Sequence, residues 1–503
     1  MDQIFDINIF VTIVITSFMV IYLLYKCSTS NFKHWEERGV PYVKPLPFVG
    51  NFWKILTWRA QIGHYLADLY NQFNNPYFGI FILDTPHLIV KCPDLIKSIL
   101  VKDFQYFNDR TVFTDEKTDS MGSKFLFFVK NPEWKFTRTR LSPAFSTGKL
   151  KNMTGLMNNV AKNLKEYIRQ NLHEGSMEAK DIFARFATDI IGTCAFGIEA
   201  YSFKSRNPQF REIGRLVFDI SPKRAVIQSL SFVAPNLIKY LRFPFFDPKF
   251  TGFMRNVFWE TVNDRKKSNY KRNDLIDHIM QLKEKSKAGE EFELVGDRIA
   301  GLAGQFFAAG FETVSSVAAF TLYELCLQPD IQNKAREEIK SIMSKYGEIT
   351  YEAIKDMKYL EMILNESLRK YPTLPFLDRV CIEDYKVPNS DFVIEKGTPV
   401  YIPVFGLHYD SIYFPDPEKF DPERFSNENK DSFPEYAFIP FGKGPRSCIG
   451  ARFGFLVCAL GLAHILSEFE VVRNSDTPVP LVYEKKGFLL ASTVGLPVAF
   501  RKL

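Results

Sequence analysis

The sequence FGKGPRSCIG occupies residues 441–450 and places one cysteine, Cys448, in a turn that contains three glycines and a proline. A strongly apolar run, ARFGFLVCALGLAHIL, follows at 451–466 and predicts a buried helix. Free N–H groups at such a turn and helix start lower a cysteine pKa and donate hydrogen bonds to the anionic sulfur. The glycines remove side-chain bulk, so a flat macrocycle can approach the backbone. The turn therefore favours Cys448 as a metal-bound thiolate.

Two other interpretations of this turn exist. An isolated buried cysteine is usually inert packing. The GKG sequence is also similar to a GxGxxG phosphate loop, but Ser447 occupies the third glycine position and no clear strand precedes it. In the thiolate interpretation, Arg446 is placed to meet an anionic group and Phe441 shields the sulfur from water.

The composition argues against several other classes of protein. The seven cysteines are odd in number and scattered without a CxxC pair, so neither a disulfide framework nor a structural zinc site is indicated. The seven histidines include no HExxH, which disfavours histidine-based metal hydrolysis. The charged stretches 263–274 and 283–293 lack a dominant basic face and are interpreted as solvated helix ends and loops. No nucleic-acid partner is expected.

Residues 7–25 carry no charge and are long enough to span a bilayer as a helix. Asp2 and Asp6 precede this run, while Lys26 and Lys33 follow it. The basic side should stay cytosolic, which leaves the N-terminus in the lumen. The basic start and small-residue cleavage site of a removable signal peptide are missing. The segment is therefore predicted to be an uncleaved signal anchor.

The rest of the chain is expected to form one domain. Three prolines within residues 41–47 predict a stiff, extended spacer, because proline fixes φ and restricts the residue before it. We expect a membrane anchor at 1–26, a proline-rich linker at 27–51 and a single catalytic domain at 52–503.

Helical periodicity dominates this domain. The clearest helix is expected at 296–328, about 48 Å long at ~1.5 Å per residue, and Pro329 should end it. Its middle is apolar on nearly all sides, which predicts a buried central helix. Strand-like alternation is confined to short pieces at 76–83, 87–91 and 398–404. The predicted fold class is mainly α with a minor β-sheet.

FGKGPRSCIG matches every fixed position of FxxGxRxCxG, the haem signature of the cytochrome P-450 family. Four weaker motifs accompany this signature. They stand in the family's order and cover nearly all of the chain, so the sequence resembles these haem-thiolate monooxygenases. The resemblance implies the cytochrome P-450 fold with its long central helix. It also implies haem as cofactor, with Cys448 as the axial ligand of the iron.

The first weaker motif, AAGFET, lies in the middle of the central helix. Gly310 should open space beside the helix, and the Thr313 hydroxyl can bond back to the Ala309 carbonyl. The resemblance implies that this groove holds dioxygen and that Glu312 and Thr313 relay protons. Val314 departs from many relatives, which carry a hydroxyl residue there. An ordinary threonine and a helix-surface glutamate are the alternative.

Two further motifs are interpreted as structural. Glu366 and Arg369, in ESLR, lie on one helical face, and PERF supplies Arg424. The resemblance implies that the three side chains form a buried charge network that supports the haem side of the core.

The fourth motif, WKFTR, places Trp134 and Arg138 on one helical face, where both can donate to a carboxylate. The resemblance implies that this pair, together with Arg446, binds haem propionates. Arg379 and Arg110 match further propionate-binding positions. A solvated arginine is the alternative in each case.

The resemblance implies insertion of one atom of O2 into lipophilic small molecules. General likeness to insect microsomal members favours plant toxins, insecticides and other xenobiotics, with endogenous lipids as a further class. The following aromatic and apolar residues should line the pocket: Phe113, 125–128, Phe306, Phe307, Phe376, Leu377 and Phe488.

Electrons must come from outside, since no nicotinamide or flavin fold is evident. The resemblance implies NADPH–P-450 reductase as the donor, with cytochrome b5 as a further partner, at the cytosolic face of the endoplasmic reticulum membrane. Lys443, Lys149 and Lys151 are candidate reductase contacts, with ordinary surface solvation as the alternative.

Three other functions stay open at this point. A P-450-type isomerase or dehydratase would act on a peroxide without reductase, although Glu312 and Thr313 argue against it. A non-catalytic haem-binding protein would use Cys448 without turnover. An unrelated membrane-anchored helical protein would keep its cysteine for packing.

Overall fold

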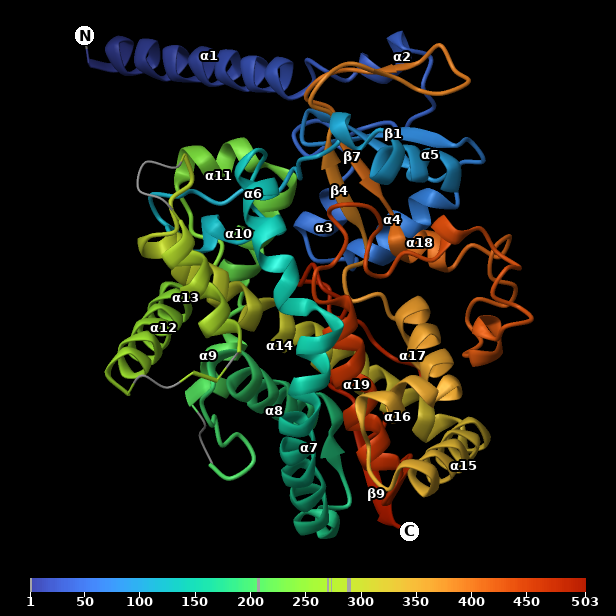
Figure 1. Ribbon diagram of the computed structural model, residues 1–503. Coiled ribbons are helices and arrows are strands. Elements are labelled where there is room, and N and C mark those ends of the chain that lie inside the picture. The colour runs from blue at the N-terminus through green and yellow to red at the C-terminus, as the bar shows by residue number, and fades with distance from the viewer. Residues whose placement is uncertain (1, 206–208, 269–270, 273, 287–290) are drawn as a thin grey trace.

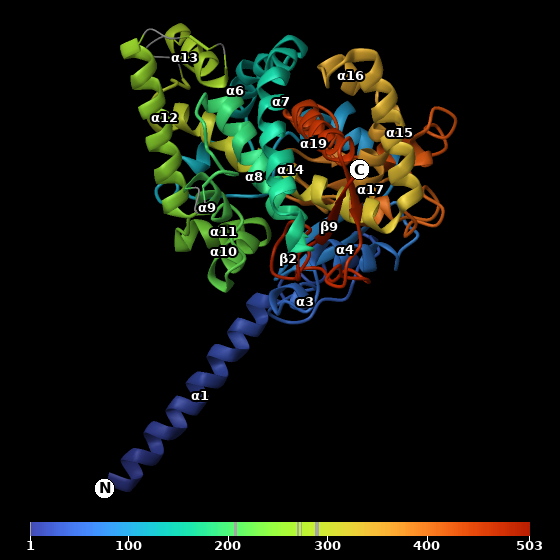
Figure 2. The ribbon, with the colours of Figure 1, turned by 90° about the horizontal axis from the view of Figure 1, so that it is seen from below.

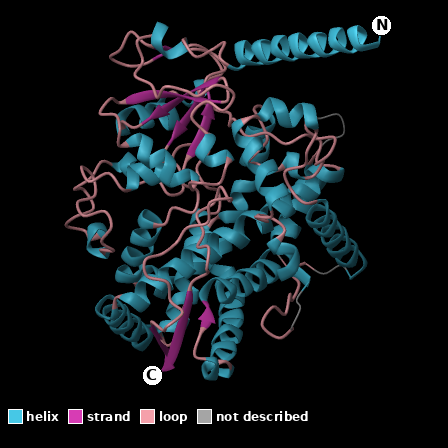
Figure 3. Cartoon of the chain, turned by 180° about the vertical axis from the view of Figure 1, so that it is seen from behind, coloured by secondary structure: helices cyan, strands magenta, loops and turns pink. Residues whose placement is uncertain are grey.

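The structure of the protein is a computed structural model (Figure 1) that describes residues 2–205, 209–268, 271, 272, 274–286 and 291–503. The charged stretches 263–274 and 283–293 lie partly outside these residues. Helices make up most of the body, and strands gather at one edge and beside the C-terminus (Figure 3). The predicted class, mainly α with a minor β-sheet, is confirmed.

Helix α14 (Gly296–Leu327) runs through the centre of the helical body (Figure 1). It packs against α8 (Ala179–Ile191), α12 (Pro248–Ser268), α17 (Lys358–Lys370) and α19 (Ala451–Leu466). Most of its side chains are buried, because its sequence offers apolar groups on nearly every side. Pro329 begins the next helix, so α14 ends within one residue of the predicted end.

The main sheet has the strand order β1–β2–β7–β4. Strands β1 (Tyr77–Ile82) and β2 (Thr85–Val90) form an antiparallel hairpin, β2 runs parallel to β7 (Pro399–Ile402), and β7 is antiparallel to β4 (Leu377–Val380). The three strands expected from sequence alternation are therefore β1, β2 and β7. Smaller ladders join β3 (Met177–Glu178), β9 (Pro497–Lys502) and β8 (Phe469–Val472), and β5 (Tyr385–Lys386) with β6 (Val393–Ile394).

Other α-helices cover this core and connect its parts. They are α2 (His34–Glu37), α3 (Trp53–Leu56), α4 (Ile62–Tyr70), α5 (Pro93–Lys97), α6 (Glu133–Leu141), α7 (Thr147–Gln170), α9 (Gln209–Arg215), α10 (Pro222–Val233), α11 (Pro235–Leu241), α13 (Leu275–Lys285), α15 (Pro329–Tyr346), α16 (Tyr351–Asp356) and α18 (Val404–His408).

Helix α1 (Asp2–Ser28) projects away from the body (Figure 2). From Ile9 to Ser28 it is apolar and long enough to cross a bilayer, and none of it is buried. Helix α14 is also long and apolar enough to cross a bilayer, but it is mostly buried, so it is the core helix of the body. An apolar helix without protein around it is compatible with a membrane anchor.

The proline-rich segment after α1 packs against the sheet and does not stand free as a spacer. The Trp35 side chain is fully buried, and its indole N–H donates to the Ile80 carbonyl at 3.1 Å. The Val43 N–H donates to the Gly79 carbonyl at 3.0 Å. A Cβ on Gly79 would lie 2.4 Å from the Trp35 ring, so glycine is needed for this approach. The segment between α1 and residue 52 is therefore held against the sheet.

Candidate active site

The loop that carries Cys448 depends on its glycines. Gly442 and Gly444 have φ values of 67° and 73°, a left-handed conformation that glycine adopts without strain. A Cβ on Gly444 would also lie 2.0 Å from the Leu100 carbonyl oxygen. The Cys448 N–H donates to the Phe441 carbonyl at 2.8 Å and closes the loop immediately before α19.

Cys448 is exposed, although Arg446, two residues earlier in the loop, is buried. Burial among the surrounding protein atoms raises the pKa of this thiol, while the Gly450 N–H and the charges of Arg138 and Arg110 lower it. An exposed sulfur that is nevertheless desolvated lies at the wall of an interior space. The N–H donor and the two arginines are the groups that a bound thiolate requires.

The AAGFET segment of α14 lies next to the helix that begins after this cysteine. The Cys458 thiol of α19 donates to the Val314 carbonyl at 3.6 Å. Ala309 is exposed in the middle of the otherwise buried α14, so it too borders an interior space. The Thr313 hydroxyl donates to the Ala309 carbonyl at 2.6 Å, the i−4 bond that the sequence predicts.

Gly310 lies where α14 meets α8. A Cβ at this position would lie 3.0 Å from the Ile191 Cδ1 atom of α8. The missing side chain allows α8 and α14 to approach closely.

Glu312 forms an ion pair with Lys180 in the first turn of α8. The Glu312 side chain is largely buried and that of Lys180 is about one-third exposed. The Lys180 backbone N–H donates to the carboxylate of Glu178, the N-cap residue of α8, at 3.1 Å. Lys180 gives no sequence signal for this role, because it lies far from Glu312 in the chain and in no recognised motif.

Arg446 lies inside the protein beside the cysteine loop. Its Nη2 donates to an Asp109 carboxylate oxygen at 3.0 Å and to the Val129 carbonyl at 3.1 Å. Its Nε donates to the Asn108 carbonyl, and its guanidinium lies 4.3 Å from the centre of the Trp134 ring. Arg446 and Trp134 are thus neighbours, as expected for two residues that are predicted to bind haem propionates together.

The other three predicted arginines also gather at this loop. Arg138 donates to the Ser447 carbonyl at 2.9 Å. Arg110 pairs with Asp378 at 2.7 Å, and Arg379 donates to the Asp378 carbonyl at 2.7 Å. The Arg379 Nε is buried without a hydrogen-bond partner among the described residues.

Positive charge exceeds negative charge in this cluster. Burial lowers the pKa of Arg446 and of Arg379 to about 9, and the charge of Arg110 adds to both effects. Burial lowers the pKa of Lys130 to about 8. Because two aspartates face these four cations, an anionic ligand with two carboxylates would relieve the imbalance.

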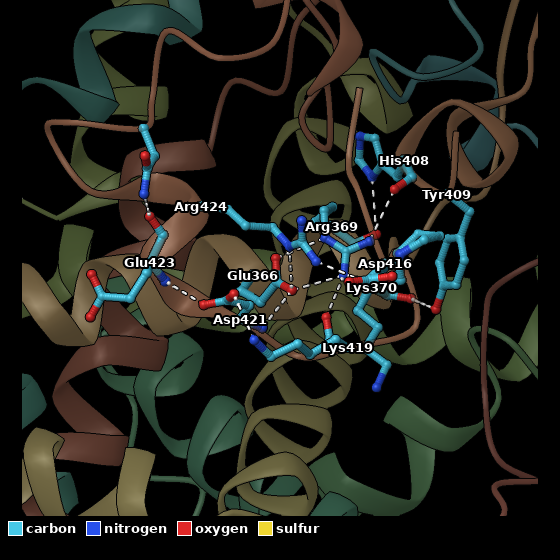
Figure 4. A network of polar contacts seen from close by, with 12 residues as sticks. Glu366, Arg369, Lys370, His408, Tyr409, Asp416, Lys419, Asp421, Glu423 and Arg424 are labelled. Atoms are coloured by element: carbon cyan, nitrogen blue, oxygen red, sulfur yellow. Dashed lines mark hydrogen bonds and ion pairs between the residues drawn. The ribbon is translucent and has the colours of Figure 1, made fainter. Parts of the chain in front are cut away.

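Glu366, Arg369 and Arg424 form the predicted charge network (Figure 4). Glu366 and Arg369 are fully buried and share two hydrogen bonds of 2.7 and 2.8 Å. The Arg424 Nε lies 3.5 Å from Glu366, and the Asp421 N–H donates to the same carboxylate at 2.9 Å. The network fastens α17 to the segment that leads toward the cysteine loop.

Lys443 and Lys151, which are proposed as reductase contacts, have acidic partners on this chain. Lys443 pairs with Glu435 at 3.0 Å, and Lys151 pairs with Glu352. Both lysines are partly exposed, which is also what ordinary surface solvation gives.

Most of the phenylalanines expected at a pocket belong to one aromatic cluster. Phe125, Phe128, Phe307, Phe376 and Phe488 are connected through rings that the sequence did not single out. These additional rings are Phe232, Phe245, Phe246 and Phe250. Phe306 packs apart from them, against Phe145 and Phe453. The sequence shows an excess of phenylalanine, but not which rings meet.

The fold and the cysteine loop agree with the comparisons with known proteins. The Cytochrome P450 family matches residues 40–496, so the chain belongs to this family of haem-thiolate monooxygenases. Cytochrome P450 6k1 of Blattella germanica is 42% identical over 97% of this chain and 96% of its own length. Cytochrome P450 6j1 of the same insect is 42% identical over 97% of each chain, and probable cytochrome P450 6g2 of Drosophila melanogaster is 38% identical over 93% and 94%.

The residues present fit the haem that the family carries. An accessible thiol with an N–H donor is suited to iron ligation, and an arginine cluster with an unpartnered Nε is suited to the two haem carboxylates.

Proposed function

We propose that the protein is a microsomal monooxygenase that inserts one atom of O2 into lipophilic xenobiotics such as plant toxins and insecticides. Endogenous lipids are a further substrate class. The observation that carries the proposal is the accessible Cys448 in its glycine loop, which leads directly into α19, the helix that contacts α14 at Val314 next to Thr313. The similarity to insect relatives supports the xenobiotic class.

The haem, when bound, supplies the oxygen-activating chemistry. Cys448 would hold its iron, and Phe441 would shield the sulfur from water. The carboxylates would be held by Trp134, Arg138, Arg446, Arg379 and Arg110. Arg379 is the best placed of these to gain from binding, because its Nε has no partner among the described residues.

Proton delivery would belong to Thr313, Glu312 and the Ala309 carbonyl. The Thr313 hydroxyl donates to Ala309, which leaves its oxygen able to accept a hydrogen bond from a ligand beside the helix. Glu312 is held by Lys180, which is partly exposed and so connects this acid with solvent. The proton for the reaction would enter along this path.

Replacing Thr313 with alanine should uncouple electron use from product formation. We expect product per NADPH to fall by about a hundredfold, the low end of what a positioned proton-transfer group contributes. NADPH consumption and peroxide release should continue. NADPH consumption, peroxide release and product are measured together in the enzyme reconstituted with NADPH–P-450 reductase. Thr313→Ser keeps the hydroxyl and should stay near wild type, and an unchanged ratio in Thr313→Ala would refute the role.

We propose residues 1–26 as the membrane anchor and 52–503 as the catalytic domain on the cytosolic side of the endoplasmic reticulum, with 27–51 as a linker that packs against the sheet of that domain. In sealed microsomes, added protease should degrade the body and leave a tag placed before Met1 intact. The reason is that Lys26 in the last turn of α1 should remain cytosolic. Protection of the body until detergent is added would show the opposite orientation.

Reconstitution with NADPH–P-450 reductase, with and without cytochrome b5, tests the activity against its alternatives. Oxidation of a lipophilic substrate panel that requires NADPH and O2 is the expected result. Product from a lipid peroxide without NADPH would identify an isomerase or dehydratase. Bound haem with no turnover of any kind would identify a haem-binding protein.

A further inference from the structure

A small pocket lies between α3, α10 and the loop at 485–488. Its volume is about 50 Å³, far below the several hundred Å³ of a site that encloses a small-molecule ligand. Lys485, which is exposed, and Lys486 line it together with Trp58. Its other lining is almost wholly apolar, so the pocket suits a lipophilic molecule but is too small to enclose one.

The buried end of this pocket is a wall of aromatic rings. Phe232, Phe376 and Phe488 line it and are at most 7% exposed. The Phe232 ring centre lies 5.7 Å from that of Phe376 and 4.9 Å from that of Phe488. Phe232 is therefore the ring that joins the other two.

The other side of this wall leads to the cysteine loop. Leu377, which follows Phe376, lies 3.7 Å from where a Cβ on Gly442 would be. Phe232 also contacts Phe127 at 6.0 Å, and the Phe127 ring lies 4.3 Å from the Arg110 guanidinium that acts on Cys448. Phe232 thus has the pocket on one side and the surroundings of Cys448 on the other.

The backbone at Phe232 is fixed from two directions. The Tyr401 hydroxyl donates to the Phe232 carbonyl at 3.2 Å, and the Phe113 N–H donates to the Ser231 carbonyl at 3.1 Å. Tyr401 itself is fully buried in the sheet. These two bonds hold the backbone of α10 at this end, so rotation of the Phe232 side chain is the most direct way to enlarge the pocket there.

We propose that this pocket is an antechamber for flat, uncharged aromatic molecules and that the Phe232 ring is the gate between it and the Cys448 site. A flat aromatic molecule can replace the ring contacts that Phe232 gives up on rotating. The apolar lining disfavours charge, and the two lysines disfavour cations. This inference rests on the proposed oxidation of lipophilic substrates.

The gate is tested with a small and a large neutral probe, 4-nitroanisole and 7-benzyloxyresorufin, in the full-length enzyme with reductase. Phe232→Ala should raise kcat/KM for the large probe about tenfold, a usual size for pocket discrimination, and change the small probe less than about twofold. Phe232→Trp should lower turnover of the large probe. The rate of the substrate-induced Soret shift should change in parallel, because the gate acts on access.

Phe218→Ala is the matched control, since Phe218 contacts Phe488 at 5.5 Å but does not line the pocket. It should leave the ratio of the two probes unchanged. If the alanine variant binds haem poorly, Phe232→Leu replaces it in the same two-probe test. An equal change for both probes, or the same change in Phe218→Ala, would overturn the gate while leaving the oxidation in place. A wild-type enzyme that oxidises neither probe nor the wider lipophilic panel would instead contradict the proposed function.

Discussion

Replacing Cys448 with alanine is expected to reduce monooxygenase turnover to the background of reductase alone. The thiol is the only group in the glycine loop that can hold iron as a thiolate, and the loop N–H and the nearby arginines are arranged around it. The fold should survive, because the loop is closed by the Cys448 N–H and the Phe441 carbonyl, which alanine keeps. Turnover of the lipophilic panel and thermal unfolding are the two measurements.

Cys458→Ala is the matched control for this variant. Cys458 lies on α19, the helix that follows the Cys448 loop, but it is buried, and its thiol contacts the Val314 carbonyl at 3.6 Å. Burial raises the pKa of Cys458 to about 12, so this thiol stays protonated. The control should keep haem and most of its activity. Full turnover in Cys448→Ala would rule out Cys448 as the ligand.

The second large effect is expected from Arg369→Ala, which should lower the free energy of unfolding by about 3–5 kcal/mol. The substitution leaves the fully buried Glu366 carboxylate without its two strongest hydrogen bonds. Burial raises the pKa of Glu366, and Arg369 is the main group that opposes this shift. Denaturant unfolding measures the loss, together with the yield of haem-containing protein.

Arg169→Ala provides the surface comparison. Arg169 pairs with Glu468 at 2.5 Å, but its side chain is about two-fifths exposed, so its removal should cost far less stability than the removal of Arg369. Equal losses of unfolding free energy in the two variants would show that the buried network stabilises the fold no more than a surface ion pair does. Arg369→Lys should recover only part of the stability, because lysine cannot make the paired contacts of a guanidinium.

Features set by neighbouring residues could be predicted from the sequence. The cysteine loop, the central helix and the Thr313 back-bond depend on contacts within a few residues. The partners Glu366 and Arg369 also lie within one helical turn. Arg424 required the family resemblance, because nothing local connects it with the other two.

Features set by packing between distant segments could not be predicted. Lys180 meets Glu312 only because α8 crosses α14, and Gly310 faces Ile191 for the same reason. Phe232 looks like any apolar helix residue in the sequence, yet it joins rings from several segments. Periodicity shows that such side chains are buried but not which neighbours they meet.

The absorbance spectrum of the reduced protein with carbon monoxide tests the central claim most directly. Wild-type protein should give the red-shifted Soret band of a thiolate-ligated haem, and Cys448→Ala should lack it. A shorter-wavelength, imidazole-type band in folded wild-type protein would mean that Cys448 is not the iron ligand. The absence of any haem band in folded wild-type protein would contradict the account as a whole.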